Sequence, residues 1–372
     1  MRRSLRRLLL LLLAAGILGA LIFHFRRGIT LAGFRWPLVW QTAREARLSL
    51  LALSVVTIYV AYAIRALRWQ RFARGMGPAR FIPLYLATLM GFACVFLLGR
   101  AGEPVRPLLI ARKDGQPVSG SFGVYVIERL MDISATVVLA GIALLAFRTR
   151  QQTGAEAATL LRAARSTGIA LFIGLMVLIA FLVWFRRSGS ARVAPRLERM
   201  KSRGGWRARF ALMLAGFGEG LQSIQTVADL LWAILYTALH WILIVFTYLW
   251  ITHSFGGSFL EFDFIGAMML LAFTMVGSAL QIPGVGGGSQ VAAFLAFTAV
   301  FGIEKEPAAT ASIILWLVTF ASSCILGVPL LIREGWSMGE LRNLARSERA
   351  AEAAGGHTPL YPGEGKSKEA RP

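Results

Sequence analysis

Long apolar blocks separated by short basic segments constrain this chain more than any other feature. A block of about 20 residues, at about 1.5 Å of rise per residue, spans the roughly 30 Å hydrocarbon core of a bilayer. A core helix of a soluble protein would carry a polar stripe instead. The blocks lie at about 8–25, 48–68, 81–98, 121–147, 167–185, 229–253, 262–281 and 308–332. They predict an all-α polytopic integral membrane protein with about eight membrane segments.

The basic residues lie between these blocks. The chain has 40 Lys and Arg and a net charge of +21. Charges in such positions set membrane topology, whereas nucleic-acid binding needs a basic face on a soluble fold, so we expect no nucleic-acid partner. The basic start followed by the run 8–25, with no small-residue cleavage site after it, predicts an uncleaved signal anchor.

The distribution of charge favours two re-entrant hairpins. If every block crossed the membrane, segment 186–228 with its nine Lys and Arg would face outward, against the positive-inside rule. The rule is satisfied if 81–98 and 103–113 form a hairpin entered from the cytoplasm, and 262–281 and 288–302 form one entered from outside. This topology places 29 of the 40 basic residues on the cytoplasmic side. Eight plain spans with an imperfect charge rule remain the alternative.

The hairpins imply an inverted repeat of about 48–147 and 229–332, the architecture of many secondary transporters. Both repeats belong to one transmembrane domain, 1–335. Within it, 206–227 is amphipathic and predicts a helix on the membrane surface, with packing against the transmembrane bundle as the alternative. The polar segment 336–372 predicts a cytoplasmic, largely disordered tail.

A break at 99–107 brings charge to membrane depth. Two glycines and two prolines cannot continue a helix, and such backbone is tolerated only where protein or water covers it. Arg100, Glu103 and Arg106 would lie at the tip of the first hairpin, and arginine suits bidentate contact with a phosphate. An ordinary cytoplasmic loop with interfacial arginines is the alternative.

A second cluster lies inside an apolar block. Glu128 and Asp132 are four residues apart and share one helix face, with Arg129 beside them. Charges at this depth are costly and face a cavity or a partner. The expected partners are Arg100 and Arg106. The group either serves transport or is an ion-pair lock between hairpin and helix.

A third cluster, at 282–290, contains Gly284, Gly286, Gly287 and Gln290. It lacks the Lys-Ser/Thr and the preceding strand of a P-loop. We interpret it as a helix break whose freed amides begin a half-helix at Ser289, with a positive end that meets an anionic headgroup. A tight turn that lets two helices pack is the alternative.

An aromatic and basic belt is predicted at the membrane interface, where the block 48–68 ends. Its members are Tyr59, Tyr62, Arg65, Arg68 and Trp69.

We expect no metal, because His240 and His253 are thirteen residues apart and two carboxylates beside arginines make a poor metal site. No soluble catalytic signature occurs, so we expect neither an enzyme nor a cofactor.

The three clusters in order are Gly99-Arg100-Ala101-Gly102-Glu103-Pro104-Val105-Arg106, Glu128-Arg129-Leu130-Met131-Asp132 and Pro283-Gly284-Val285-Gly286-Gly287. Together they resemble the lysylphosphatidylglycerol synthase transmembrane-region family, a flippase-like domain of bacteria and archaea, over about 45–335. The resemblance implies a bacterial-type plasma membrane protein, with both termini cytoplasmic, that moves an aminoacylated or other anionic or glycosylated lipid between leaflets. It also implies that the residues of the three clusters contact the lipid.

Two departures of this sequence from the family pattern limit what the resemblance implies. Gln290 stands where the family often has an acidic residue, and no aminoacyl-transferase domain follows residue 335, so the lysyl-lipid substrate is not transferred. The leading hypothesis is a lipid translocase whose partners are membrane lipids. The alternatives are an assembly partner of a lipid or glycan synthase and, more distantly, an enzyme acting on lipid phosphates. A homo-oligomer remains open.

Overall fold

A computed structural model describes two long stretches of the chain. They are 35–146, without residues 75, 77–78 and 115–117, and 226–335, without 279–280 and 283–285, together with isolated positions between 166 and 177. The predicted segment 8–25 and the tail 336–372 lie outside the described residues. Most of segment 167–185 also lies outside them, as do residues 206–225 of the predicted surface helix 206–227.

The described chain is almost entirely helical. Its first stretch contains α2 (Trp36–Glu45), α3 (Leu48–Ala73), α4 (Phe81–Leu98), the 3-10 turn η1 (Gly99–Gly102), α5 (Val105–Asp114) and α6 (Val118–Ala146). The second contains α10 (Val227–His253), the 3-10 turn η3 (Gly257–Glu261), α11 (Phe264–Gly277), α12 (Gly288–Leu295), the π-helical η4 (Ala296–Val300), α13 (Lys305–Trp316), the π-helical η5 (Leu317–Ala321) and α14 (Ser322–Arg333). Between α11 and α12, β1 (Gln281–Ile282) pairs antiparallel with β2 (Gly286–Gly287), with Gln281 opposite Gly287.

Five helices of the described residues are long and apolar enough to cross a membrane. They are Leu48–Ala73, Phe81–Leu98, Gly120–Ala146, Val227–His253 and Lys305–Arg333, the last formed by α13, η5 and α14 in one run. Phe264–Gly277 and Gly288–Val300 are apolar but shorter. The chain is therefore a multi-pass α-helical membrane protein, as the apolar blocks predicted. The count of eight segments and the re-entrant course of the hairpins stay predictions.

Polar caps fix where the second-half helices begin. Thr226 and Asp229 form a capping box at α10, each side chain accepting the backbone N–H of the other at 3.1 Å. Asp263 accepts the N–H of Gly266 at 2.7 Å at the start of α11. These caps satisfy amides that the apolar helices leave unpaired at their ends.

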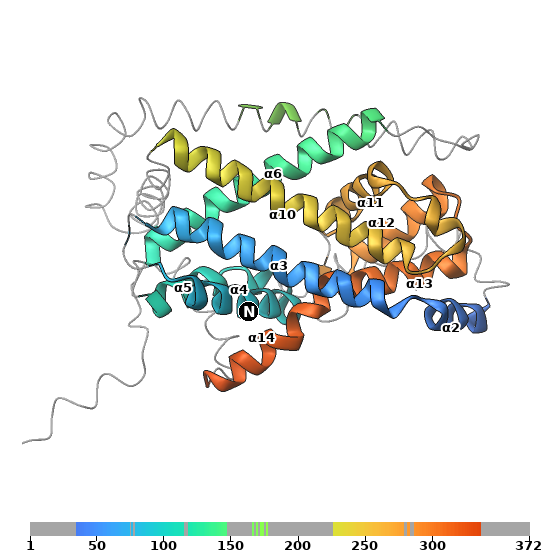
Figure 1. Ribbon diagram of the computed structural model, residues 1–372, viewed down its shortest axis with the longest axis horizontal. Coiled ribbons are helices and arrows are strands. Elements are labelled where there is room, and N and C mark those ends of the chain that lie inside the picture. Colours follow the sequence, from blue (N-terminus) through green and yellow to red (C-terminus); the bar gives the residue numbers. More distant parts are fainter. Residues whose placement is uncertain are drawn as a thin grey trace, which may run out of the picture.

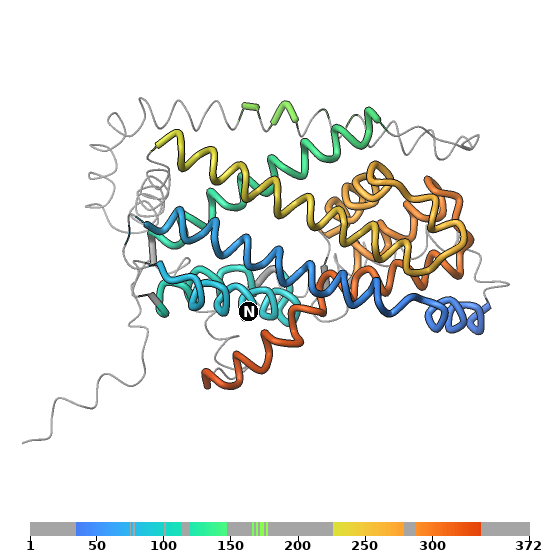
Figure 2. Tube along the Cα trace, viewed as in Figure 1, coloured from blue at the N-terminus to red at the C-terminus, as the bar shows by residue number. Residues whose placement is uncertain are grey.

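The two stretches pack against each other in opposite orientations. α3 and α10 lie side by side and run in opposite directions (Figure 1). α4 packs against α14, and in the same way α11 packs against α6. The α4–α5 pair lies toward the end of the molecule where α3 finishes, whereas α11 and α12 lie toward the end where α3 begins (Figure 2). This is the packing that an inverted repeat requires, although the repeat itself stays a prediction.

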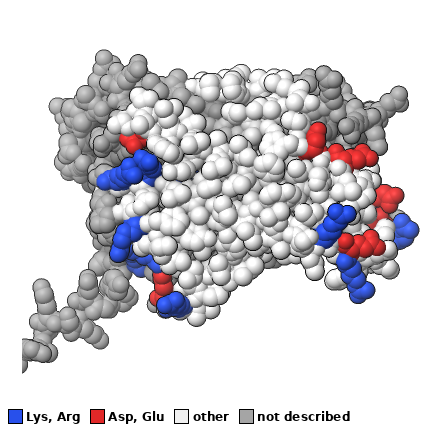
Figure 3. All heavy atoms as spheres, viewed as in Figure 1, with Lys and Arg blue, Asp and Glu red and all other residues white. Residues whose placement is uncertain are grey.

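On the face shown in Figure 3, charged side chains gather at the two ends of the molecule and leave an uncharged band between them. Where α3 finishes, the described charges are mostly basic: Arg71, Arg74, Arg80, Arg112, Lys113 and Arg333 against Asp229 and Glu334. Where α3 begins they are mixed: Arg35, Arg44, Arg47 and Lys305 against Glu45, Glu261, Asp263, Glu304 and Glu306. The band matches a bilayer core, and the more basic end is the predicted cytoplasmic side.

The contact between α4 and α14 depends on a glycine. A Cβ on Gly327 would lie 2.6 Å from both Ala93 Cβ and the Leu89 carbonyl oxygen. We expect Gly327→Ala to push the helices apart and lower the stability by about 1–3 kcal/mol. Thermal unfolding in detergent would measure the loss. Gly141→Ala in α6 is the matched control, because nothing lies within 4 Å of its added Cβ; equal effects of the two changes would contradict the close packing.

Cysteine labelling from each side of the membrane tests the hairpin topology. In a background without Cys94 and Cys324, we expect single cysteines at Arg80 and Lys113, which flank α4 and α5, to react from the same side. Cysteines at Arg47 and Arg74, which flank α3, should react from opposite sides and serve as the control. Labelling of the first pair from opposite sides would show that the segment 81–113 crosses the membrane.

Candidate functional site

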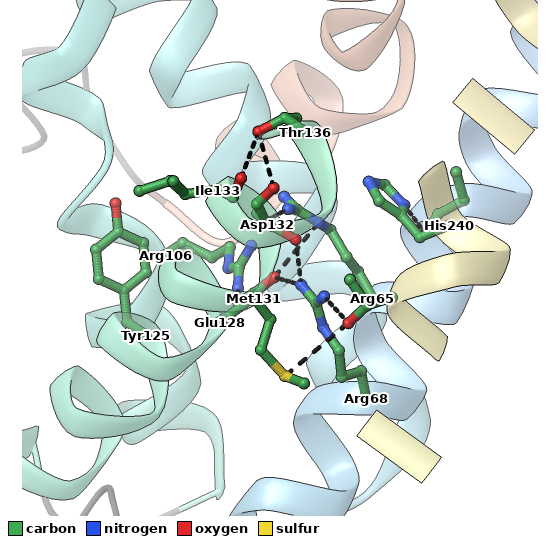
Figure 4. Close-up of polar contacts among 12 residues, drawn as sticks. Arg65, Arg68, Arg106, Tyr125, Glu128, Met131, Asp132, Ile133, Thr136 and His240 are labelled. Atoms are coloured by element: carbon green, nitrogen blue, oxygen red, sulfur yellow. Dashed lines mark hydrogen bonds and ion pairs between the residues drawn. The ribbon is translucent and has the colours of Figure 1, made fainter. Parts of the chain in front are cut away.

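Five ionisable side chains meet inside the bundle (Figure 4). Arg65 and Arg68 come from α3, Arg106 from α5, and Glu128 and Asp132 from α6, and each residue is at most 5 % exposed. We call these five residues the charge cluster. Burial of this kind is tolerated only when the charges pair, because moving an isolated ion out of water costs far more than a fold can supply.

The pairing is continuous across the three helices. Arg68 Nη2 lies 2.9 Å from both Glu128 Oε1 and Asp132 Oδ1, so it bridges the two carboxylates. Arg65 pairs with Asp132 through Nη2, and its Nε lies 3.3 Å from Glu128 Oε1. Arg106 Nη2 pairs with Glu128 Oε2. The spacings i, i+3 on α3 and i, i+4 on α6 put both members of each helix on one face.

The charge cluster has one more guanidinium than carboxylate. Within the described residues, all three arginines have a buried nitrogen without a hydrogen-bond partner: Nε of Arg65, Nε of Arg68, and Nε and Nη1 of Arg106. A buried N–H with no acceptor costs about 1–3 kcal/mol, and more when the group is charged. An anion at Arg106 could therefore accept hydrogen bonds from unpartnered N–H groups. It would also neutralise the excess of one positive charge in the cluster.

Aromatic rings form the wall beside Arg106. Its guanidinium carbon lies 4.8 Å from the centroid of Trp69 and 5.7 Å from that of Phe92, close enough for cation–π attraction. Gly91 on α4 permits this position, because a Cβ there would lie 2.5 Å from Arg106 Cβ. The α4–α5 pair thus holds Arg106 against α3 and α6.

The charge cluster also reaches the second half of the chain. Arg68 Nη1 donates to Thr237 Oγ1 of α10 at 2.7 Å. One turn along α10, the buried His240 places Nδ1 3.2 Å from the Ala61 carbonyl oxygen. The Arg68–Thr237 hydrogen bond therefore links the charge cluster of α3, α5 and α6 to α10.

A family model for the lysylphosphatidylglycerol synthase TM region matches residues 8–327. The chain belongs to this family. The resemblance drawn from the three motifs is thereby confirmed, and membership supports a role connected with membrane lipids. No curated protein and no solved structure gave a match.

Three of the predicted site residues of this lysylphosphatidylglycerol synthase TM-region protein meet in the charge cluster: Arg106, Glu128 and Asp132. The predicted pairing of Arg106 with a carboxylate of α6 is confirmed. Arg100 belongs to η1, and its side chain lies outside the described residues.

Glu103 and Arg129 gather at Tyr125 instead. The Tyr125 hydroxyl donates to Glu103 Oε2 at 2.6 Å, and the Arg129 guanidinium lies 5.0 Å from the centre of the same ring. Tyr125 points away from the charge cluster (Figure 4). These two predicted residues therefore form a separate polar group around Tyr125 of α6.

The glycine loop of this family member is organised by Gln290. Gly287 has φ 135° and ψ −119°, a conformation reserved for glycine, and its N–H donates to Gln290 Oε1 at 2.9 Å. The side chain of Gln290 thus caps α12. This helix begins at Gly288, one residue before the predicted start of the half-helix at Ser289. Gly286 pairs in β2, and Gly284 lies outside the described residues. β1 lies against η1, so the tips of the two hairpins meet.

The predicted interfacial role of Arg65 and Arg68 is wrong. α3 continues to Ala73, so both arginines lie more than a turn inside the helix, where they are the main partners of Asp132. The apolar block appeared to end at 68 because these arginines lowered its hydropathy. Two features of the sequence could have indicated this pairing. The two arginines have an i, i+3 spacing, and two buried carboxylates need more than one cation.

The charge balance predicts unequal effects of two substitutions. Glu128→Gln leaves three arginines with one carboxylate, so we expect it to cost about 3–5 kcal/mol of stability. Arg106→Met leaves two arginines with two carboxylates, and Glu128 keeps Arg68 at 2.9 Å, so we expect less than half of that loss. Unfolding of both variants in one detergent would measure the difference. Equal losses would show that Arg106 is as necessary to the fold as Glu128, and would contradict the interpretation of Arg106 as a surplus charge.

Proposed function

We propose that this protein translocates a lipid with a phosphate-bearing headgroup between the leaflets of a bacterial plasma membrane, without a catalytic step. The observation that carries the proposal is the surplus positive charge of the charge cluster, together with Arg106 Nε and Nη1, which are buried without a hydrogen-bond partner among the described residues. A purely structural ion-pair lock would be balanced, because an unpaired buried charge destabilises the fold. A ligand that supplies the missing charge explains the imbalance.

A phosphodiester fits this site by charge and by hydrogen bonding. It carries one negative charge, which equals the excess of the cluster, and its oxygens accept from a guanidinium in a planar, bidentate manner. Arg106 would donate to the phosphate from Nη1, which has no hydrogen-bond partner among the described residues. Glu128 would keep Arg106 oriented while Arg65 and Arg68 hold both carboxylates.

The hairpins would provide the path. The meeting of β1 with η1 places the two broken segments next to each other, and the charge cluster lies behind the first of them. In the proposed inverted repeat, rocking of one half against the other would expose Arg106 first to one leaflet and then to the other. The acyl chains would stay in the bilayer while the headgroup passes. The more basic end would face the cytoplasm, with both termini on that side.

Lipid translocation in proteoliposomes tests this proposal. Fluorescent phosphatidylglycerol, phosphatidylcholine and a glycolipid without phosphate would be compared, with ionic gradients imposed in parallel. We expect headgroup-selective movement of a phosphate-bearing lipid, and a fall of about tenfold or more in Arg106→Met, because a charge-assisted hydrogen bond contributes about 1.5–3 kcal/mol.

Arg71→Met is the matched control. Arg71 is on α3, and its guanidinium stacks 4.9 Å from the ring of Trp232, near the membrane surface and outside the charge cluster. We expect this variant to translocate lipid like the parent. A folded Arg106→Met protein with unchanged rates would refute the proposed role of Arg106. An inactive parent protein that copurifies with a synthase would favour the assembly-partner hypothesis.

A further inference from the structure

The buried indole of Trp69 lies beside the charge cluster but takes no part in its ion pairs. Trp69 follows Arg68 on α3, and 1 % of it is exposed. The centroid of its ring lies 4.8 Å from the guanidinium carbon of Arg106. The indole therefore borders the position at which the proposed function places a phosphate.

The N–H group of this indole has no acceptor. Trp69 Nε1 is buried without a hydrogen-bond partner among the described residues. The ring belongs to a hydrophobic cluster with side chains such as Leu84 of α4 and Ile127 of α6, which offer no acceptor. Buried tryptophan N–H groups usually have a partner, because the N–H loses its water on burial. An aromatic face needs no N–H to attract a cation, as Phe92 shows 5.7 Å from the same guanidinium.

Arg106 by itself satisfies only part of a phosphate. Its Nη2 is committed to Glu128, whereas Nη1 and Nε have no partner among the described residues. Nη1 and Nε lie on different edges of the planar guanidinium, so they cannot donate side by side to one phosphate. Arg106 therefore offers one hydrogen bond, from Nη1, to a group that has two free oxygens. The second oxygen needs another donor.

We propose that the indole N–H of Trp69 is this second donor and binds the headgroup phosphate beside Arg106 Nη1. This inference rests on the proposed function and identifies the chemical group that the site recognises. Tryptophan and arginine side chains donate hydrogen bonds and do not accept them. A pair of such donors fits the free oxygens of a phosphodiester, which only accept, and offers no acceptor to an ammonium group. The headgroup is thus recognised here by its phosphate.

A water molecule is the competing partner of the indole. A water bound in the hydrophobic cluster could accept the Trp69 proton, and the N–H would then have a structural role only. The two partners differ in one measurable respect, because only a phosphate makes the affinity for an anionic lipid depend on the N–H.

Binding of a short-chain lipid to the full-length protein in nonionic detergent separates the two partners. The probe is dihexanoylphosphatidylglycerol, which carries a phosphodiester with one negative charge, and its affinity is measured by isothermal titration calorimetry. We expect Trp69→Phe to bind the probe about tenfold more weakly than the parent, because one hydrogen bond to a charged group is lost. The probe should also change the tryptophan fluorescence of the parent, and this change should be lost in Trp69→Phe.

Two further variants separate the N–H from the size of the ring. Replacement of Trp69 by 3-benzothienylalanine keeps the bicyclic ring and exchanges only the N–H for sulfur, so it should weaken binding as Trp69→Phe does without a loss of thermal stability. Trp241→Phe is the matched control. Nε1 of Trp241 is also buried without a partner among the described residues, but its ring packs against His240 in a different hydrophobic cluster. This variant should keep the affinity of the parent.

Parental affinity in both Trp69 variants would overturn the inference and assign the N–H to a water, while the proposed function would stand. Absence of probe binding by the parent would also overturn it. Translocation by the parent in proteoliposomes decides the proposed function separately, because that assay does not depend on which donor accompanies Arg106.

Discussion

The cost of burying charge in an apolar bundle governs the first half of this protein. Arg65, Arg68 and Arg106 and the two carboxylates of α6 are at most 5 % exposed, and no one of them would be stable there alone. Their pairing therefore forces α3, α5 and α6 into one arrangement. Gly91 must be small to admit Arg106, and Thr237 must face Arg68 from α10. The helical hairpin is thus tied to the bundle by electrostatics as well as by packing.

The same cluster is unbalanced, and the proposed lipid-binding role rests on this imbalance. Arg68 bridges both carboxylates and Arg65 reaches both, so Glu128 and Asp132 would be satisfied without Arg106. The third arginine also pairs with Glu128, and it brings the charge cluster to three guanidinium groups against two carboxylates. Its position, on α5 just after the broken segment η1, is where a headgroup entering between the hairpin tips would arrive. Membership of a lipid-related family and this surplus charge point to the same class of ligand.

The two halves use one packing scheme with different chemistry. α3 and α10 run side by side in opposite directions, and each half packs its hairpin against the final helix of the other. In the first half the space behind the hairpin holds ions, and in the second it holds the hydroxyls of Tyr248, Thr274, Ser289, Ser312 and Thr319 around a small cavity. The two halves therefore differ in charge although their packing is alike.

The sequence by itself determined that this is a helical membrane protein, because the length and apolarity of a block decide whether it can span a bilayer whatever it contacts. It also singled out Glu128, Asp132 and Arg106, since a charge inside an apolar block requires a partner. It did not assign Arg65 and Arg68, because a basic residue near the end of a block looks the same whether it meets lipid headgroups or a buried carboxylate.

The tertiary structure alone decided which charges meet, that Glu103 and Arg129 group at Tyr125, and that hydroxyls from five elements surround one cavity. These contacts join residues far apart in the chain, so they depend on the relative placement of whole helices. Local spacing, which is all that a single sequence displays, does not contain that placement.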